Sequence, residues 1–213
     1  MTGGIVTARS DMHQSDSPAC NVAKAIILDR DGVINADSDD YIKSPAEWHP
    51  IPGSLESIAR LNRAGYRVAV ATNQSAVGRG IMPLEVLAAI HTKMTAAVAA
   101  AGGRIDALVY CPHVPDAACE CRKPKPGMLH EIAAMLRVDL YGVPFVGDSL
   151  ADILAARAVG ARPILVLTGK GRRTIADPSC PSGIEAFADL AAAVTALLAE
   201  GAARCSVIPG RAA

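Results

Sequence analysis

The sequence predicts an α/β protein with a Rossmann-like parallel sheet and helices on both faces. Short apolar runs rich in Val, Ile and Leu alternate along the chain with longer runs rich in Ala and Leu. Strands that are separated by helices of this length pair in parallel, and the helices then cover the sheet. Polar residues follow several of the apolar runs, which is where ligands bind in such sheets.

The first predicted strand-helix-strand unit spans residues 24–73, and its helix carries residues typical of helix ends. The run "KAIILD" (24–29) is predicted to be a buried strand. The helix predicted at 54–65 has Ser54 as its expected N-cap and Gly65 at its end. The run "YRVAVATN" (66–73) is the second strand.

The rest of the chain repeats this alternation. A long helix at 83–103 opens at Pro83 and closes in glycine, which is the usual asymmetry of helix ends. The remaining runs predict a strand at 105–111, a helix at 126–138, a strand at 143–148, a helix at 149–160, a strand at 162–169 and a helix at 184–200.

The length of 213 residues suits one domain with tails. We expect a flexible N-terminal tail at 1–23, a folded domain at 24–200 that includes a metal-binding loop at 111–121, and a C-terminal tail at 201–213. No insertion between the predicted strands is large enough to form a second domain.

The charge balance argues against nucleic acid or a membrane as partner. Lys+Arg and Asp+Glu each number 21, so no bulk attraction to polyanions is expected. No apolar run approaches the roughly 20 residues of a membrane span, and the N-terminal stretch lacks the pattern of a secretory signal. We therefore expect a cytoplasmic protein, in which thiols stay reduced.

Paired carboxylates mark the end of the first strand. Asp29 and Asp31 are two residues apart and point the same way, and Gly32 lets the backbone turn at once. Carboxylates held together repel unless a cation or a proton lies between them. A surface turn is the alternative reading, whereas an EF-hand is excluded because Ile34 stands where its loop requires glycine.

Two further strand ends carry polar groups. Thr72 and the neutral residues at 73–75 suit phosphate oxygens, although such residues are also common in turns. Asp148 follows the fourth strand directly, and Asp152 lies one helical turn later, where it could accept a hydrogen bond from a site residue. Either acid could instead be a helix-start residue favoured by the macrodipole.

A cluster of cysteines and a histidine precedes the helix at 126–138. Three thiolates and one imidazole make a closed tetrahedral zinc set, which indicates a structural site; its members are Cys111, His113, Cys119 and Cys121. A disulfide is the main alternative, but it would leave the third cysteine and the histidine without a role. The spacing is not the Cys-x-x-Cys of a redox dithiol. Cys20, Cys180 and Cys205 are interpreted as ordinary residues.

Taken together, these motifs resemble the haloacid dehalogenase superfamily of phosphohydrolases over roughly residues 24–200. The matching order is Asp-x-Asp-Gly, a strand-end Thr, a Lys before a helix, and a strand-end Gly-Asp. The resemblance implies an aspartyl-phosphate mechanism with Asp29 as nucleophile, Asp31 as general acid and base, and Thr72 and Lys123 as phosphoryl-binding residues. It also implies Mg²⁺ held by Asp29, Asp148 and the backbone carbonyl of Asp31.

The cysteine cluster narrows this resemblance. With "DRDGVIN", "TNQS" and "CRKPKPGM", the chain is similar to the D-glycero-D-manno-heptose 1,7-bisphosphate 7-phosphatases. That family implies a capless fold, structural Zn²⁺, a sugar-phosphate substrate in nucleotide-activated heptose biosynthesis (lipopolysaccharide or S-layer) and, by analogy, a monomer. The implied substrate contacts are Asn73, Gln74, Ser75, Arg122, Asp37 and Tyr41, with Arg79 and Arg122 as cations for a second phosphate.

Other functions stay open at this point. Histidinol-phosphate phosphatases share most of these motifs, zinc included, and another small phosphate ester could be the substrate. A signalling receiver domain also uses Asp, Thr and Lys around an aspartyl-phosphate, but it would lack the acid at Asp31 and has no need of a zinc loop. A zinc-stapled interaction module without chemistry is the remaining alternative, and the order of four motifs argues against it.

Overall fold

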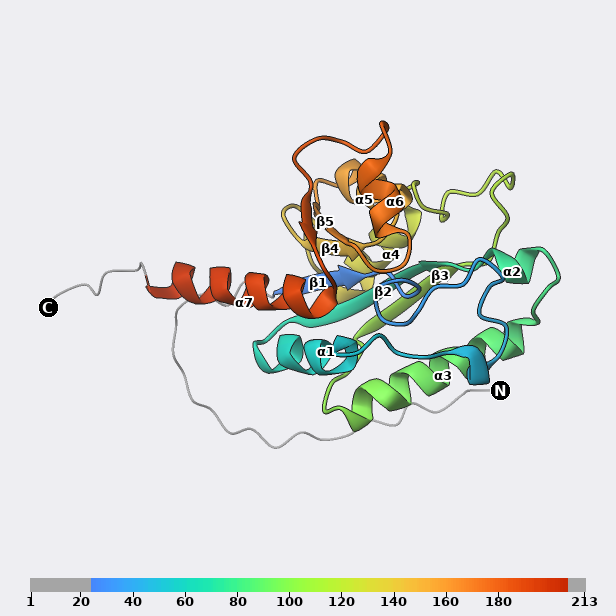
Figure 1. The fold of residues 1–213 in the computed structure, drawn as a ribbon, viewed down its shortest axis with the longest axis horizontal. Helices are drawn as coiled ribbons and strands as arrows, with labels where there is room; N and C mark the ends of the chain where they lie inside the picture. The colour runs from blue at the N-terminus through green and yellow to red at the C-terminus, as the bar shows by residue number, and fades with distance from the viewer. Residues whose placement is uncertain (1–23, 207–213) are drawn as a thin grey trace, which may run out of the picture.

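The structure, a computed structural model, describes residues 24–206 (Figure 1). It contains one sheet of six parallel strands in the order β3-β2-β1-β4-β5-β6. The strands are β1 (Ala25–Leu28), β2 (Arg67–Asn73), β3 (Ala107–Cys111), β4 (Pro144–Gly147), β5 (Arg162–Val166) and β6 (Glu185–Phe187). The tail predicted at 1–23, and the part of the C-terminal tail from residue 207, lie outside the described residues.

Helices cover both faces of the sheet, as the sequence predicts (Figure 1). One face carries α1 (Ser54–Arg63), α3 (Leu84–Ala100) and α7 (Leu190–Ser206), and the other carries α4 (Gly127–Leu136) and α5 (Leu150–Ala158). Three short helices complete the fold: η1 (Pro45–Glu47), α2 (Ser75–Gly78) and α6 (Gly171–Ala176).

The strands are buried on both sides, which explains their continuous apolar runs. In β1, Ile26 and Leu28 face the core under α1, α3 and α7, whereas Ala25 and Ile27 face the core under α4 and α5. This alternation follows from the two-residue period of a strand. The central strands are therefore fixed in register and form a rigid base for the residues that follow them.

The direction of the chain across the sheet changes between β1 and β4. The first half of the chain builds outward from β1 to β2 and β3, and the second half builds outward from β4 to β5 and β6. At such a switch point the loops after the two central strands separate and leave a crevice beyond their carboxyl ends. Asp29 and Asp148 follow these two strands directly, so the topology brings them to one place.

The predicted helix at 184–200 is wrong at its start. Residues 185–187 form the edge strand β6, in which Glu185 and Phe187 pair with Ile164 and Val166 of β5. A three-residue strand has no period of its own to detect, and pairing with β5 decides its conformation. The helix that follows continues past residue 200 to Ser206, so the start of the predicted C-terminal tail is helical.

Ser54 is not the N-cap that the sequence suggests. Gly53, at φ 82°, occupies the cap position of α1, and the Ser54 hydroxyl donates to the Ile34 carbonyl at 2.7 Å. This bond ties α1 to the loop after β1. At the other end, Gly65 has the left-handed φ of 83° that the prediction requires.

Within residues 24–206, no segment between the strands forms an additional domain, in agreement with a capless fold. None of the helices in this part of the chain combines the length and the hydrophobicity needed to cross a bilayer.

Candidate active site

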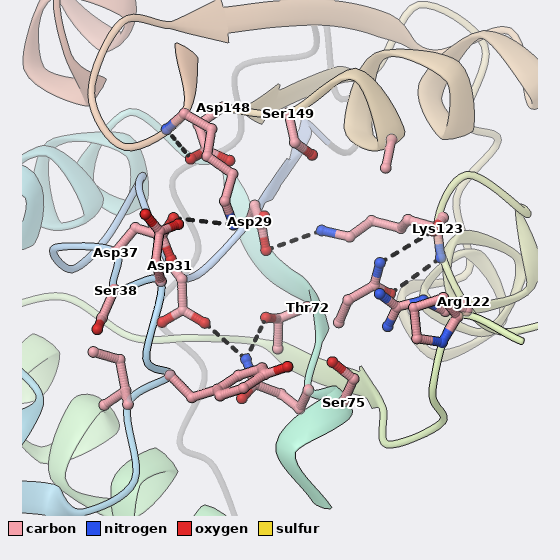
Figure 2. A pocket seen from close by; sticks show the side chains of 18 of the residues that line it. Asp29, Asp31, Asp37, Ser38, Thr72, Ser75, Arg122, Lys123, Asp148 and Ser149 are labelled. Atoms are coloured by element: carbon pink, nitrogen blue, oxygen red, sulfur yellow. Dashed lines mark hydrogen bonds and ion pairs between the residues drawn. The ribbon is translucent and has the colours of Figure 1, made fainter. Parts of the chain in front are cut away.

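A pocket of about 400 Å³ lies beyond the carboxyl ends of β1, β2 and β4. Figure 2 shows that side chains from these three strand ends and from the loop before α4 point into it. It gathers every residue that the sequence suggests for catalysis, phosphate or sugar binding: Asp29, Asp31, Asp37, Tyr41, Thr72, Asn73, Gln74, Ser75, Arg79, Arg122, Lys123 and Asp148.

Lys123 connects the loop before α4 to the end of β1 (Figure 2). Its Nζ lies 2.9 Å from Asp29 Oδ1 and 2.6 Å from Asp152 Oδ1, and it donates to the Ala71 carbonyl at 2.7 Å. Burial alone lowers the pKa of Lys123, but the carboxylates of Asp152 and Asp29 outweigh it and hold the pKa above its usual value. Lys123 is therefore a charged ammonium group in a buried position.

The backbone of Lys123 is fixed by Asn73. The Asn73 amide accepts from the Lys123 N–H and donates to the Lys123 carbonyl, both at 3.1 Å. Asn73 lies at the end of β2, so this pair of hydrogen bonds anchors an irregular loop to the sheet. The substrate contact predicted for Asn73 is thus accompanied by a second role, which is to hold the lysine.

The Asp148 carboxylate lies so close to two backbone segments that only glycine fits at positions 32 and 169. A Cβ on Gly32 would lie 2.1 Å from Asp148 Oδ2, and one on Gly169 would lie 2.2 Å from the same atom. Both glycines have positive φ, 80° and 53°. The carboxylate also accepts from the Lys170 N–H at 2.7 Å. Asp148 is therefore held rigidly against the turn that follows Asp29.

The carboxylates around Asp29 and Asp148 suit a divalent cation. Asp29, Asp148 and Asp152 each bring an oxygen within 4.8 Å of the other two. Burial and the charge of Asp152 raise the pKa of Asp29 to about 7, and burial and the charge of Asp29 raise the pKa of Asp148 to about 8. A hard cation such as Mg²⁺ would relieve the repulsion between the Asp29 and Asp148 carboxylates by binding an oxygen of each.

Both carboxylate oxygens of Asp152 already contact other residues of the site. Its Oδ1 pairs with Lys123, and its Oδ2 accepts from the backbone N–H of Ser149 at 3.0 Å and from the hydroxyl at 2.6 Å. The bond from the Ser149 N–H is one half of the capping box of α5. Asp152 thus meets both expectations for it, because it accepts hydrogen bonds at a helix start and contacts a site residue.

Asp31 has a different environment from Asp29. Its carboxylate accepts from the Arg30 side chain, from Asn35 Nδ2 at 2.8 Å and from Gln74 Nε2 at 2.8 Å. Burial raises its pKa, but the Arg30 charge and these hydrogen bonds outweigh that effect and hold it below its usual value. The two carboxylates of this motif therefore have pKa values that their surroundings shift in opposite directions.

The Gln74 side chain lies between Asp31 and Thr72. Besides Asp31, its Nε2 donates to Thr72 Oγ1 at 2.9 Å, and its Oε1 accepts from Arg30 at 3.1 Å. Gln74 is buried, so its amide orients other site residues in addition to lining the pocket.

The predicted zinc site lies beside the pocket. Cys111, His113, Cys119 and Cys121 bring one ligand atom each within 4.8 Å of the others, and all three cysteines are free. The sulfur of Cys111 lies 3.2 Å from that of Cys121 and 3.8 Å from that of Cys119, and His113 Nδ1 lies 3.2 Å from Cys121 Sγ. The edges of a tetrahedral zinc site are about 3.6 to 3.8 Å. The separations of 3.2 to 3.8 Å are equal to or slightly shorter than these edges, so a small outward movement of the side chains would admit Zn²⁺.

The 111–121 loop reaches the pocket through its last residues. Arg122 Nη1 donates to the His113 carbonyl at 3.1 Å, and Lys123 follows directly. The Gln74 N–H donates to the Cys111 carbonyl at 2.7 Å, which joins the loop to the end of β2. A metal bound by this loop would therefore fix the backbone that carries the Arg122 and Lys123 side chains into the pocket.

One cation of the pocket was not identified from the sequence. Lys170 lines the pocket, and its Nζ pairs with Asp37 Oδ2 at 3.0 Å. Lys170 follows β5 within "TGKG", which is a polar strand end that the same reasoning could have used. Arg30, buried between Asp29 and Asp31, was also missed, because a basic residue next to two acids reads as a surface residue.

Comparisons with known proteins agree with this geometry. A family model described as HAD-hydrolase-like matches residues 120–193. The chain is 58% identical over 173 residues to the D-glycero-beta-D-manno-heptose-1,7-bisphosphate 7-phosphatase of Pseudomonas aeruginosa, which covers 81% of this chain and 97% of the relative. The protein of the same name from Bordetella bronchiseptica is 54% identical over 177 residues, covering 83% and 99%.

Solved structures give the same result. The D,D-heptose 1,7-bisphosphate phosphatase from B. bronchiseptica, solved in complex with magnesium and phosphate, superposes with a TM-score of 0.81 at 54% identity, covering 83% of this chain and 99% of that one. The phosphatase of the same name from Burkholderia thailandensis has a TM-score of 0.66 at 47% identity, covering 82% and 98%.

Proposed function

This chain belongs to the D-glycero-D-manno-heptose 1,7-bisphosphate 7-phosphatase family of HAD-like hydrolases and is a phosphoric monoester hydrolase; on this basis we propose that it removes the C7 phosphate of heptose 1,7-bisphosphate through an aspartyl-phosphate intermediate. The observation that carries the proposal is the pocket, which joins a buried carboxylate pair to a buried lysine.

In this proposal, Asp29 attacks the phosphorus atom and the C7 alkoxide leaves. Asp31 gives a proton to that alkoxide and later removes one from the water that hydrolyses the aspartyl-phosphate. The dianion of the arriving phosphate raises the pKa of Asp31, which favours the protonated form needed for the first step. Lys123 and the Thr72 hydroxyl stabilise the phosphoryl oxygens.

We assign Mg²⁺ to Asp29, Asp148 and the backbone carbonyl of Asp31. All three residues line the pocket, and Asp29 lies beside the buried ammonium of Lys123. When bound, the metal would offset the repulsion between the carboxylate nucleophile and the phosphate. The magnesium in the B. bronchiseptica phosphatase structure supports this assignment.

The sugar and the second phosphate are assigned to the outer part of the pocket. Its cations are Arg79, Arg122 and Lys170, and Asp37, Tyr41 and Ser75 offer groups for sugar hydroxyls. Asn73 and Gln74 line the same pocket, but they act mainly through Lys123 and Asp31, because their amides bond to these residues.

The substrate assignment predicts a clear order of turnover. With Mg²⁺ present, kcat/KM for heptose 1,7-bisphosphate should exceed that for histidinol phosphate by at least about 100-fold, because histidinol phosphate cannot pair with the outer cations. Phosphate release from both anomers of the bisphosphate and from histidinol phosphate measures this ratio. Equal or inverted values would assign the chain to another small phosphate ester.

We further propose that the 111–121 loop binds one structural Zn²⁺ through Cys111, His113, Cys119 and Cys121. The closed four-ligand set leaves no position for a substrate. Burial raises the pKa of the Cys111 thiol to about 12, so a cation is required to hold this sulfur as a thiolate ligand.

Cys121→Ser tests the zinc site. We expect zinc near one equivalent in the unmodified chain and a large loss in the variant, with Tm lower by roughly 4–8 °C, which corresponds to about 2 kcal/mol. Zinc is quantified by mass spectrometry and Tm by calorimetry. Cys180→Ser is the matched control, because Cys180 lies outside the cluster. Unchanged zinc content in Cys121→Ser would contradict the proposed ligand set.

For the biological setting, we propose a cytoplasmic monomer that acts on a free sugar phosphate in nucleotide-activated heptose biosynthesis, with residues 24–200 as its phosphatase domain and without nucleic acid or membrane as a partner. The free thiols of the 111–121 loop suit a reducing compartment. The balanced charge of the chain supports a small-molecule partner.

A further inference from the structure

Arg30 stands between Asp29 and Asp31 in the sequence, and its side chain is buried beside the carboxylate of Asp31. It lies in the loop after β1, and its side chain is 0% exposed. A buried guanidinium is stable only when its donors are satisfied. Three of its contacts go to Asp31: Nε donates to Oδ1 at 3.0 Å, and Nη2 donates to Oδ1 at 2.9 Å and to Oδ2 at 2.8 Å.

These contacts restrict the orientation of the Asp31 carboxylate. Oδ1 accepts from Arg30 and Asn35, and Oδ2 accepts from Arg30 and Gln74. A carboxylate offers about four lone-pair sites, and these donors occupy most of them. The Asp31 side chain retains 21% exposure and lines the pocket. The donors thus surround the carboxylate and leave one edge of it toward the pocket.

His91 on α3 holds the other side of the guanidinium. Arg30 Nη1 lies 3.2 Å from His91 Nε2. Arginine has no acceptor, so His91 Nε2 must accept this hydrogen bond and the imidazole must be neutral. Burial and the adjacent Arg30 charge lower the pKa of His91 to about 4, which agrees with a neutral ring. The imidazole also packs in a tilted arrangement against Tyr110, with 5.6 Å between the ring centroids.

We propose that Arg30 is a positioning residue that fixes Asp31 for proton transfer, and that His91 fixes Arg30 in turn. The inference rests on the proposed function, in which Asp31 protonates the leaving alkoxide. The planar fork of arginine contacts both carboxylate oxygens in one plane, whereas the ammonium of lysine is a point charge that does not fix the plane of the carboxylate. His91 supplies the acceptor that keeps the fork in this plane, although it does not itself line the pocket.

A purely structural role predicts a different result from a positioning role. If Arg30 and His91 only stabilise the fold, their replacement lowers Tm and affects all substrates equally. If they position Asp31, the loss depends on whether the leaving group needs a proton. A sugar alkoxide needs one, whereas p-nitrophenolate leaves without one. The parameter kcat/KM includes only steps up to departure of the leaving group, so it isolates this difference.

The experiment compares heptose 1,7-bisphosphate with p-nitrophenyl phosphate. For Arg30→Lys we expect kcat/KM to fall by about 100-fold or more with the bisphosphate, in line with the usual contribution of acid catalysis, and by less than about 5-fold with p-nitrophenyl phosphate. His91→Leu should show the same selectivity with a loss of roughly 10-fold, and His91→Gln, which retains an acceptor, should recover most of it. His130→Leu, at an exposed histidine of α4, is the unaffected control.

Each outcome decides the inference. Equal losses with both substrates, or no loss in either Arg30→Lys or His91→Leu, would overturn it. If Arg30→Lys fails to fold, as judged by circular dichroism, the ratio in His91→Leu relative to His91→Gln carries the test. Failure of the proposed function would appear in the unmodified chain as absent turnover of the bisphosphate, and the comparison would then use another sugar phosphate that the chain hydrolyses.

Discussion

Asp29→Asn is expected to abolish phosphate release while leaving the fold intact. An amide oxygen is a poor nucleophile, so kcat should fall on the order of 10⁴-fold or more. The fold should persist because Asn has the shape of Asp. Asp29 Oδ1 accepts a hydrogen bond from the Arg30 backbone N–H at 2.7 Å, and the amide oxygen of Asn can accept the same bond. The ion pair with Lys123 is reduced to a hydrogen bond on the same oxygen, and this loss is offset by removal of a buried charge beside Asp148 and Asp152.

Single-turnover phosphate release, with circular dichroism and Tm on the same samples, measures both parts of this prediction. Asp139→Asn is the matched control, because Asp139 is exposed and its interaction with the Tyr141 N–H also suits an amide. Turnover by Asp29→Asn within tenfold of the unmodified chain would remove Asp29 from the role of nucleophile. A stable phospho-Asp29 in the unmodified chain would instead favour a receiver-like function.

Lys123→Met is expected to impair both activity and stability. The substitution keeps most of the apolar stem of the side chain but leaves Asp29 and Asp152 buried without their shared cation. Breaking a buried ion pair from one side costs about 3–5 kcal/mol. The phosphoryl group would also lose its buried ammonium, so kcat should fall on the order of 10³-fold. The stability loss should be smaller at pH 5 than at pH 8, because the stranded carboxylates can then bind protons.

Denaturant unfolding at pH 5 and pH 8, together with steady-state assays, tests this double effect. Lys125→Met is the control from the same "KPKP" segment, because Lys125 pairs with the exposed Glu120; we expect no measurable change in turnover there. Full activity of Lys123→Met would contradict the phosphoryl-binding role. A loss of activity without any loss of stability would show that the two ion pairs contribute little to folding.

The two predictions share one physical origin. Lys123 lies 2.9 Å from the proposed nucleophile and 2.6 Å from Asp152, and all three side chains are almost fully buried. The same ion pairs therefore hold the loop before α4 against the sheet and keep a positive charge beside the phosphate position. In the proposed mechanism, catalytic and structural functions are combined in the Lys123 side chain, so they cannot be changed independently.

The fold class and most of the pocket residues could be predicted from the sequence. The buried strands carry continuous apolar runs, and the helices between them impose parallel pairing. Asp29, Thr72 and Asp148 each follow or end a strand, and parallel strands bring their carboxyl ends to one edge. The cysteine cluster could be found because three thiols and an imidazole within a short loop match a ligand set, whatever the surrounding fold.

Other features depend on tertiary contacts that leave no local pattern. The edge strand β6 exists because it pairs with β5. Ser54 bonds to Ile34 rather than capping its helix, because the loop after β1 places that carbonyl above it. Arg30 and His91 are 61 positions apart, and only the packing of α3 against the sheet brings them together. The sequence by itself determined which residues gather in the pocket and in the cysteine cluster, because strand ends and ligand sets are local patterns. The tertiary structure decided how those residues are oriented and charged, because burial and partner choice depend on segments far apart in the chain.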